Sequence, residues 1–261
     1  MKRILAILCF VVAAKASAQS FMTNEPYVWL CTNAANADAS WVNDGSAGGV
    51  FTAPGTAPIL AADYYIFKVG AHMTGDFSSA LSETNDIAIS MWIHPTNTAV
   101  FHSYLLNYSG AAASGWQITM EGSGNLRAGI RDIGNTSYLF KGLGTPSIGW
   151  HHVFLRYSWQ GPGVMDFLLD GTNMPDLYTL GTPSLGASAS AYLGLGIAPD
   201  GAVDSAHWCS DVRIWIGAPA IDLEVGSNLY ANGRNYYDPP TPPANPDDNY
   251  RAAAQWWRMI R

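Results

Sequence analysis

The stretch Ile87-Ala88-Ile89-Ser90-Met91-Trp92-Ile93 decides the fold, because large apolar residues occupy every second position. Alternation with a period of two places such residues on one face of a β-strand. Similar short runs, rich in β-branched and aromatic residues, recur from about residue 27 to residue 216, and none of ten or more residues has helical periodicity. The chain is therefore predicted to be all-β.

Turn-forming residues separate these runs at Gly122-Ser123-Gly124-Asn125, Gly161-Pro162-Gly163 and Asp170-Gly171. The predicted strands are residues 27–31, 64–69, 87–94, 116–121, 126–131, 150–159, 164–170, 191–196 and 211–216. So many strands predict an all-β, two-sheet antiparallel jelly-roll sandwich. A short helix over residues 221–230 and a Pro-rich tail are predicted to follow it.

Three ordered segments strengthen this interpretation. They are Ile87–Ile93 with its tryptophan, Gly149-Trp150-His151-His152-Val153 followed by Phe167-Leu168-Leu169-Asp170-Gly171, and Asp211-Val212-Arg213-Ile214-Trp215 before a helical segment. In this order they resemble the laminin-G-like domains of the concanavalin A-like lectin/glucanase superfamily. The resemblance implies the fold, but lectins, hydrolases, lyases and adhesive modules all share that fold, so it implies the function only broadly.

Both ends of the chain differ in composition from its centre. Lys2 and Arg3 precede the apolar run 4–14, and Ala16-Ser17-Ala18 completes the pattern of a secretory signal peptide. The predicted division is a signal peptide over 1–18, a laminin-G-like domain over 19–233, and a Pro-rich linker with a short helix over 234–261. The run is too short for a transmembrane segment. The predicted location is secreted, periplasmic or on the cell surface, or on a virion surface if residues 1–18 are retained.

The low content of charged residues and the negative net charge limit the kinds of partner that the protein can bind. Only 13% of the 261 residues are charged, against about 25% in an average globular domain. The formal net charge is −7, and about −10 without residues 1–18. With 13 basic residues in all, no nucleic-acid partner is expected. The predicted partner is a glycan or glycoprotein. The C-terminal segment could also contact a protein scaffold, as a surface-assembly or virion decoration protein would, or fold back onto the sandwich.

Patterns typical of catalysis are missing from the sequence. Glycan hydrolysis needs two carboxylates on one face of the site. None of the glutamates in the chain has an acidic residue two or four positions after it; they are Glu25, Glu83, Glu121 and Glu224. There is no Gly-x-Ser-x-Gly elbow, phosphate loop or His-Glu-x-x-His site. His151 and His152 are adjacent on a strand and should point to opposite faces. The chain is therefore predicted to be a non-catalytic binding module rather than a polysaccharide-degrading enzyme.

Alternation also predicts a ligand-binding face. If the strands share a sheet, the residues opposite the apolar positions gather on its outer surface: Trp92, Gln117, Arg127, Arg131, His152, Arg156, Arg213 and Trp215. Aromatic rings can stack on sugars, and arginines can hold acidic groups of a glycan. In the alternative, the arginines pair with aspartates across strands and the tryptophans lie under loops.

Two further predictions concern metal and sulfur. No cofactor is required, but a structural calcium ion could bind in loops that contain Asp44, Asp200 and Asp204, which ordinary turn chemistry explains as well. Cys31 and Cys209 remain once Cys9 is removed with the signal peptide. They could form a disulfide or stay as two buried free thiols.

Overall fold

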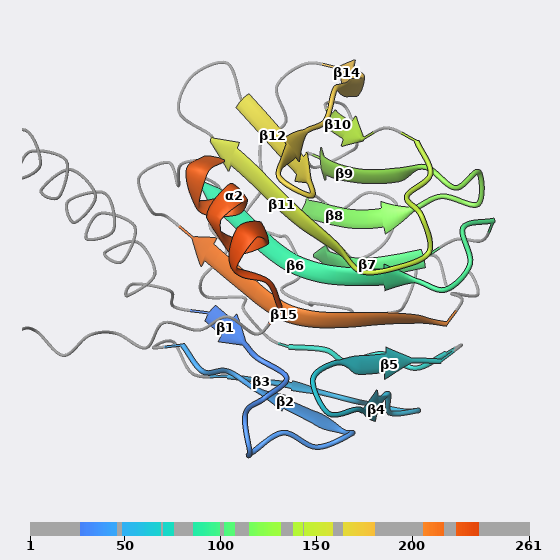
Figure 1. Cartoon of the computed structure of the whole chain (residues 1–261), viewed down its shortest axis with the longest axis vertical. Coiled ribbons are helices and arrows are strands. Elements are labelled where there is room, and N and C mark those ends of the chain that lie inside the picture. The colour runs from blue at the N-terminus through green and yellow to red at the C-terminus, as the bar shows by residue number, and fades with distance from the viewer. Residues whose placement is uncertain are drawn as a thin grey trace, which may run out of the picture. The chain divides into compact units, whose positions relative to one another are not determined.

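Two antiparallel sheets face each other and enclose the core of the protein, as the computed structural model shows (Figure 1). The structure describes residues 27–45, 49–68, 70–75, 86–99, 102–107, 115–131, 138–142, 144–158, 164–180, 206–216 and 223–234. All of them belong to one unit, residues 25–236. The predicted signal peptide, the strand predicted over 191–196 and the tail after residue 234 lie outside the described residues, so they stay predictions.

The larger sheet has eight strands among the described residues. Its order is β13 (Thr172–Asn173), β12 (Val164–Leu169), β11 (His151–Ser158), β6 (Ile87–Pro95), β15 (His207–Ile216), β5 (Tyr65–Phe67) and β4 (Ile59–Leu60), with β1 (Tyr27–Trp29) paired to β15. Long antiparallel registers join β6 to β11 and β15, so these three strands form its centre.

The smaller sheet has five described strands, in the order β14 (Asp176–Leu180), β10 (Tyr138–Gly142), β9 (Leu126–Arg131), β8 (Gly115–Met120) and β7 (His102–Asn107). A separate two-stranded sheet joins β2 (Ser40–Val42) to β3 (Val50–Thr52). The predicted turn over 122–125 joins β8 to β9, whose register pairs Met120 with Leu126. The two-sheet antiparallel sandwich predicted from the alternation is confirmed.

The core lies between the two sheets and contains the residues predicted to face inward. Ile89 and Met91 of β6 and Val153 of β11 are fully buried in it, as are Ile118 and Ile130 of the smaller sheet. Burying a side chain of this kind stabilises the fold by about 1.5–3 kcal/mol. The alternating stretch Ile87–Ile93 therefore forms most of β6, a central strand of the larger sheet.

The Asp170-Gly171 pair makes the turn between β12 and β13. Leu169 pairs with Thr172, so the connection has two residues. Both have positive φ, 50° at Asp170 and 74° at Gly171, as in a type I′ turn. The predicted hairpin turn is confirmed.

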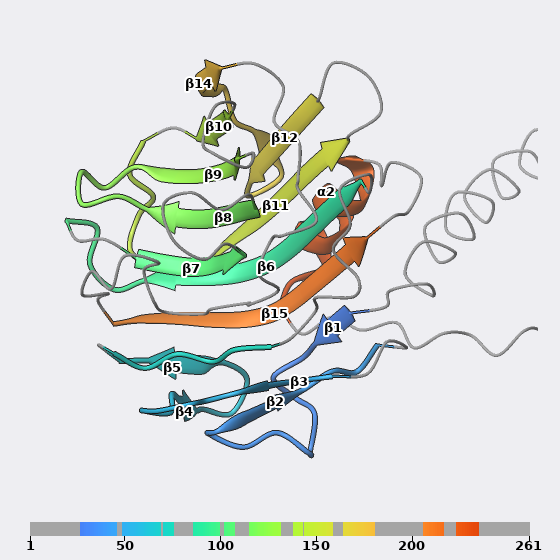
Figure 2. The same cartoon turned by 180° about the vertical axis from the view of Figure 1, so that it is seen from behind.

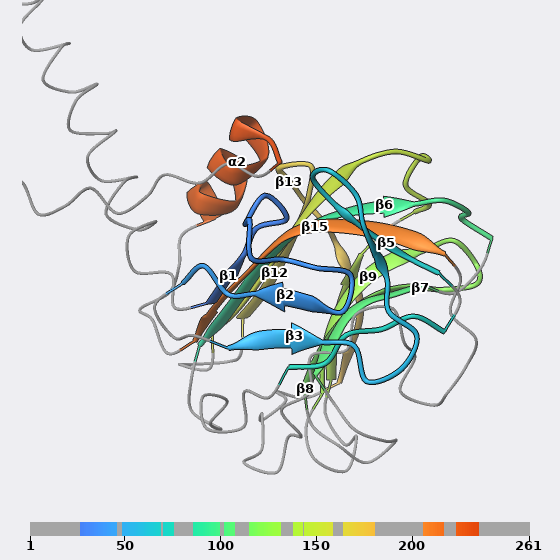
Figure 3. The ribbon, with the colours of Figure 1, turned by 90° about the horizontal axis from the view of Figure 1, so that it is seen from below.

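The helix α2 (Leu223–Asn232) packs on the outer face of the larger sheet. It lies in front of β6 and β15 in Figure 1 and behind them in Figure 2, and Figure 3 shows it above the same sheet. Val225 and Leu229 are buried, and Gly226 lies against Phe154 of β11 so closely that an added Cβ would be 2.6 Å from the Phe154 Cγ. The predicted helix is present, and it covers part of the sheet. Among the described residues, no helix is long and apolar enough to cross a membrane.

Candidate functional site

The residues predicted to form one ligand face lie on two different sheets. Trp92, His152, Arg156, Arg213 and Trp215 belong to the larger sheet. The smaller sheet contains the other three, Gln117, Arg127 and Arg131. The condition for a single ligand face, that these strands share one sheet, is not met, because the β8–β9 hairpin lies across the core instead of extending the first sheet (Figure 1).

Most of the predicted residues of the larger sheet are also buried. Their exposed fractions are 8% for Trp92, 0% for His152, 1% for Arg213 and 3% for Trp215. They do point away from the core between the sheets, but α2 covers them: the Tyr230 ring stacks over Trp92 with centroids 6.0 Å apart. Gln117 of the smaller sheet is only 3% exposed. The expectation that these side chains meet solvent is therefore wrong.

The described arginines of the predicted face are paired with acidic residues. Arg156 of β11 donates from Nε (3.1 Å) and Nη2 (2.5 Å) to Oδ2 of Asp166, its cross-strand partner in β12. Arg213 Nε lies 3.1 Å from Asp211 Oδ1, with both side chains buried. Arg127 pairs with Glu121. Arg156 matches the alternative in which arginines pair with aspartates across strands, whereas Arg213 pairs within its own strand and Arg127 pairs with a glutamate. The side chain of Arg131 lies outside the described part.

Asp44, one of three predicted calcium ligands, organises the loop after β1. Its Oδ2 accepts a hydrogen bond from the Leu30 N–H (3.0 Å) and its Oδ1 accepts one from Asn33 Nδ2 (2.6 Å). Burial raises the pKa of Asp44. Asp200 and Asp204 lie outside the described residues. Within the described ranges no group of three or more His, Cys, Asp or Glu side chains is placed to hold a metal ion, and calcium stays a prediction.

Cys31 and Cys209 are both buried and unbridged. Burial raises the pKa of Cys31 to about 12 and that of Cys209 well above its usual value. Of the two alternatives that the sequence left open, the structure contains the free thiols, which act as small apolar core residues.

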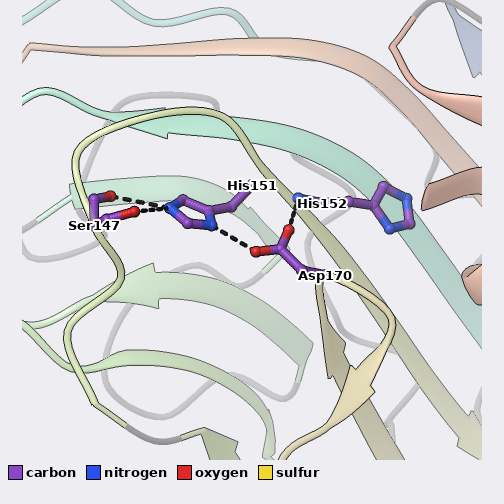
Figure 4. Close-up of polar contacts among 4 residues, drawn as sticks. All are labelled: Ser147, His151, His152 and Asp170. Atoms are coloured by element: carbon purple, nitrogen blue, oxygen red, sulfur yellow. Dashed lines mark hydrogen bonds and ion pairs between the residues drawn. The ribbon is translucent and has the colours of Figure 1, made fainter. Parts of the chain in front are cut away.

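His151 and His152 point to opposite sides of β11, as predicted (Figure 4). The His152 ring is buried under α2, with Nε2 2.8 Å from Ser90 Oγ. Burial lowers its pKa to about 3, so it is neutral. The His151 ring instead faces Asp170 in the turn after β12, with Nδ1 2.7 Å from Oδ2. The second Asp170 oxygen accepts a hydrogen bond from the His152 backbone N–H at 2.9 Å.

Ser147, His151 and Asp170 have the order of contacts of a hydrolytic triad, but the His151 ring contacts two oxygens of Ser147 (Figure 4). His151 Nε2 is 3.2 Å from Ser147 Oγ and only 3.0 Å from the Ser147 carbonyl oxygen, which can only accept. Nδ1 faces the Asp170 carboxylate, to which it is placed to donate, and this hydrogen bond raises the pKa of His151. A proton on Nε2 that is shared with the Ser147 carbonyl oxygen would leave no lone pair to activate the Ser147 hydroxyl. The contacts join the segment before β11 to the turn after β12.

A different group of side chains forms a half-exposed surface on the larger sheet. We call Tyr64, His94, Trp150 and Trp208 the aromatic cluster. Tyr64 precedes β5, His94 lies near the end of β6, Trp150 precedes β11, and Trp208 is the register partner of His94 in β15. All four side chains are half-buried. The sheet register therefore gathers rings from four separate segments.

The rings of the aromatic cluster pack against one another. The Trp208 centroid is 4.1 Å from His94 and 5.1 Å from Tyr64, which stacks on it. Trp150 meets Tyr64 and His94 edge to face, at 5.5 and 5.3 Å. Contacts of this kind stabilise aromatic pairs by about 0.5–1.5 kcal/mol beyond burial. The four rings thus form one packed aromatic surface.

Arg234, just after α2, borders the aromatic cluster. Its Cζ lies 4.0 Å from the Trp150 ring centroid and 5.9 Å from that of Tyr64. Its Nη2 donates to Asp63 Oδ2 at 2.9 Å. Burial lowers the pKa of His94, and the positive charges of His151 and Arg234 lower it further. One charged pair and one neutral imidazole thus accompany the aromatic rings.

Comparisons with known proteins agree with this architecture. The laminin G family model described as concanavalin A-like lectin/glucanases superfamily matches residues 69–218. No curated protein matches the chain.

Several solved structures share the fold. The ligand binding domain of botulinum neurotoxin serotype D in complex with N-acetylneuraminic acid is 13% identical, with a TM-score of 0.57 over 82% of this chain and 52% of that one. The binding domain of botulinum neurotoxin DC in complex with SialylT is 13% identical, with a TM-score of 0.59 over 80% of this chain and 51% of that one. The botulinum neurotoxin type G receptor binding domain is 10% identical, with a TM-score of 0.56 over 80% of this chain and 51% of that one. The chain spans about half the length of these structures.

Proposed function

Because the chain belongs to the concanavalin A-like lectin/glucanases superfamily, we propose that it is an exported, non-catalytic module that binds a glycan, free or on a glycoprotein, through the aromatic cluster. The observation behind this proposal is a packed, partly exposed group of rings on the larger sheet. The ring faces and the polar pair at their border are the two kinds of group that a sugar needs.

Sugar rings have apolar faces of C–H groups and a rim of hydroxyls. Half-exposed aromatic side chains bury such faces without losing much conformational freedom, because Trp208 and Tyr64 are already held by their stacking. Asp63 can accept hydroxyl hydrogen bonds at the edge, since its side chain is 38% exposed, and Arg234 can donate them. Few, well-placed polar groups beside apolar surface are typical of small-molecule sites.

Two further observations favour binding over catalysis. The Ser147 carbonyl oxygen lies closer to His151 Nε2 than the Ser147 hydroxyl does, 3.0 Å against 3.2 Å, which does not favour proton transfer from that hydroxyl to the ring. The three neurotoxin structures are described as binding domains, two of them in complex with N-acetylneuraminic acid or SialylT. Similarity at this level of identity concerns the fold, so the choice of ligand is argued from the residues of this chain.

The test is binding to a broad glycan array, followed by calorimetric titration of each oligosaccharide retained. Trp208→Ala should weaken binding by about tenfold or more, as expected for a central aromatic contact. The control is Tyr230→Ala, which removes an aromatic ring that is 40% exposed but outside the cluster, and it should leave affinity within about twofold. Unchanged affinity in folded Trp208→Ala protein would refute the proposed site.

A further inference from the structure

The charges around the aromatic cluster occur as internal pairs. The Arg234 guanidinium, stacked on Trp150, is bonded to the Asp63 carboxylate at 2.9 Å. The His151 ring, next in sequence to Trp150, is bonded to the Asp170 carboxylate at 2.7 Å, so any positive charge on it is paired as well. Each cation that borders the rings in the described part of the chain therefore already has a carboxylate of its own.

The remaining described groups nearby do not supply a free cation at the rings. His94 is neutral at pH 7, because burial between the tryptophans lowers its pKa. Lys68 is exposed just after β5, but it is four residues from Tyr64, roughly 13 Å along an extended strand. The whole chain has a formal net charge of −7, which repels anions at long range.

An anionic sugar would therefore be a poor ligand. Bringing a carboxylate or sulfate against the rings removes its water shell, and the loss must be balanced by a cation. Here the charge of Arg234 is already neutralised by Asp63, so an anion would meet a neutral ion pair, with the Asp63 carboxylate close by, rather than an uncompensated positive charge. Uncharged hydroxyls incur no such loss, since they can donate to the paired Asp63 and accept from the paired Arg234.

Resting on the proposed glycan-binding function, we infer that the aromatic cluster selects uncharged saccharides and discriminates against sialylated, uronate-containing or sulfated forms of the same sugars. Arg234 and Asp63 form an ion pair without net charge, and this pair forms hydrogen bonds with the sugar hydroxyls. This assignment differs from the anion-holding role first expected of the arginines on the predicted ligand face.

The experiment compares saccharides that share a backbone and differ in charge. The probes are lactose-terminated oligosaccharides with and without terminal sialic acid, and gluco-oligosaccharides with and without uronate or sulfate groups. Dissociation constants are measured for the wild-type chain at about 50 and 300 mM NaCl. We expect the neutral member of a pair to bind at least tenfold more tightly, with less than a twofold change between the salt concentrations.

A variant provides a test in the opposite direction. Asp63→Asn leaves Arg234 without its carboxylate, so the charged members of each pair should gain fivefold or more in affinity, and that gain should disappear at high salt. The matched control is Asp166→Asn, which removes the carboxylate charge paired with Arg156 on the same sheet but away from the aromatic cluster, and it should produce no gain.

The outcomes separate the two proposals. Tighter or equal binding of the charged probes by the wild-type chain, with loss of affinity in Trp208→Ala, overturns the selection of uncharged sugars and leaves the aromatic site standing. Binding of no saccharide, or binding that ignores Trp208→Ala, overturns the proposed function and this inference together. A gain for charged probes in Asp166→Asn equal to that in Asp63→Asn also overturns the inference. The wild-type comparison decides the matter even where a variant does not fold.

Discussion

The His151 Nδ1 lies 2.7 Å from Asp170 Oδ2, and this contact ties the start of β11 to the turn after β12 (Figure 4). Asp170 also exchanges backbone hydrogen bonds with His152, donating to its carbonyl and accepting at its own carboxylate, both at 2.9 Å. Because Trp150 directly precedes His151, the same contact fixes one ring of the aromatic cluster. This side-chain contact thus links the hairpin to the segment that carries Trp150.

Replacing His151 with Gln should lower the free energy of unfolding by about 1 kcal/mol, in a pH-dependent way. The hydrogen bond to Asp170 raises the pKa of His151, so its stabilisation is complete below pH 6.5 and is lost as pH rises through the folded-state pKa. Burial raises the pKa of Asp170, but its hydrogen bonds from His151 and His152 outweigh burial and lower it. The stabilisation that the Asp170 carboxylate contributes is complete above pH 3.8 and is lost as the pH falls through its lowered pKa.

Urea unfolding of the wild type and the His151→Gln variant at several pH values measures this difference. It should be largest between about pH 3.8 and 6.5 and should shrink on the alkaline side. A difference that stays constant from pH 5 to pH 9 would show that His151 is not held as a cation.

Gly226→Ala should weaken the attachment of α2. The added Cβ would lie 2.6 Å from Cγ and 3.0 Å from Cβ of the buried Phe154, atoms that cannot swing aside as the end of a flexible side chain can. The overpacking costs about 1–3 kcal/mol and exceeds the gain of roughly 1 kcal/mol in helix propensity. Thermal unfolding checks this, with half-buried Ser227→Ala as the control in the same helix. Equal stabilisation by both alanines would contradict the packing argument.

The sequence predicts the directions of side chains well, because alternation is a local property. Ile89 and Val153 lie in the core as expected, and the Asp170-Gly171 turn has the positive φ values that this pair favours. The alternation of apolar and polar residues does not determine which sheet a hairpin joins, or which element covers the outer face of a sheet. The helix near residues 221–230 is visible in the sequence, yet its docking over Trp92 depends on tertiary packing.

Trp208 shows a second limit of sequence reasoning. Extending the inward set Val212 and Ile214 backwards by steps of two would place residue 208 inward. The register of β15 against β6 shifts between Ser210 and Arg213, so Cys209 takes the core position and Trp208 faces outward. A bulge inserts a residue without a clear sequence signal, and it reverses every side chain beyond it. For this reason the aromatic cluster was missed.

Cys31 and Cys209 should resist alkylation in the folded protein. The thiolate is the reactive form, and burial raises the pKa of Cys31 to about 12 and that of Cys209 well above normal. Iodoacetamide treatment with and without denaturant, followed by peptide mass mapping, checks each site. Both peptides should be modified only in denaturant. A mass corresponding to the two peptides joined by a disulfide would instead favour the bridge that the sequence allowed.

Trp92→Ala should destabilise the protein without altering the glycan site. Trp92 is 8% exposed and lies between the His152 ring at 5.2 Å and the Tyr230 ring at 6.0 Å, so its removal leaves a cavity beneath α2. The expected loss is about 3–5 kcal/mol in the free energy of unfolding. Because Trp92 is outside the aromatic cluster, protein that remains folded at low temperature should keep its saccharide affinity within about twofold.

The control for this prediction is Arg156→Ala, another residue first expected to contact ligand. Arg156 donates two hydrogen bonds to the buried Asp166, so its loss leaves that carboxylate without this partner and should cost about 1–3 kcal/mol, while affinity stays unchanged. Chemical denaturation and calorimetric titration of both variants separate stability from binding. Wild-type stability together with lost binding in Trp92→Ala would place the ligand under α2 and transfer the site from Trp208 to the covered half of the sheet.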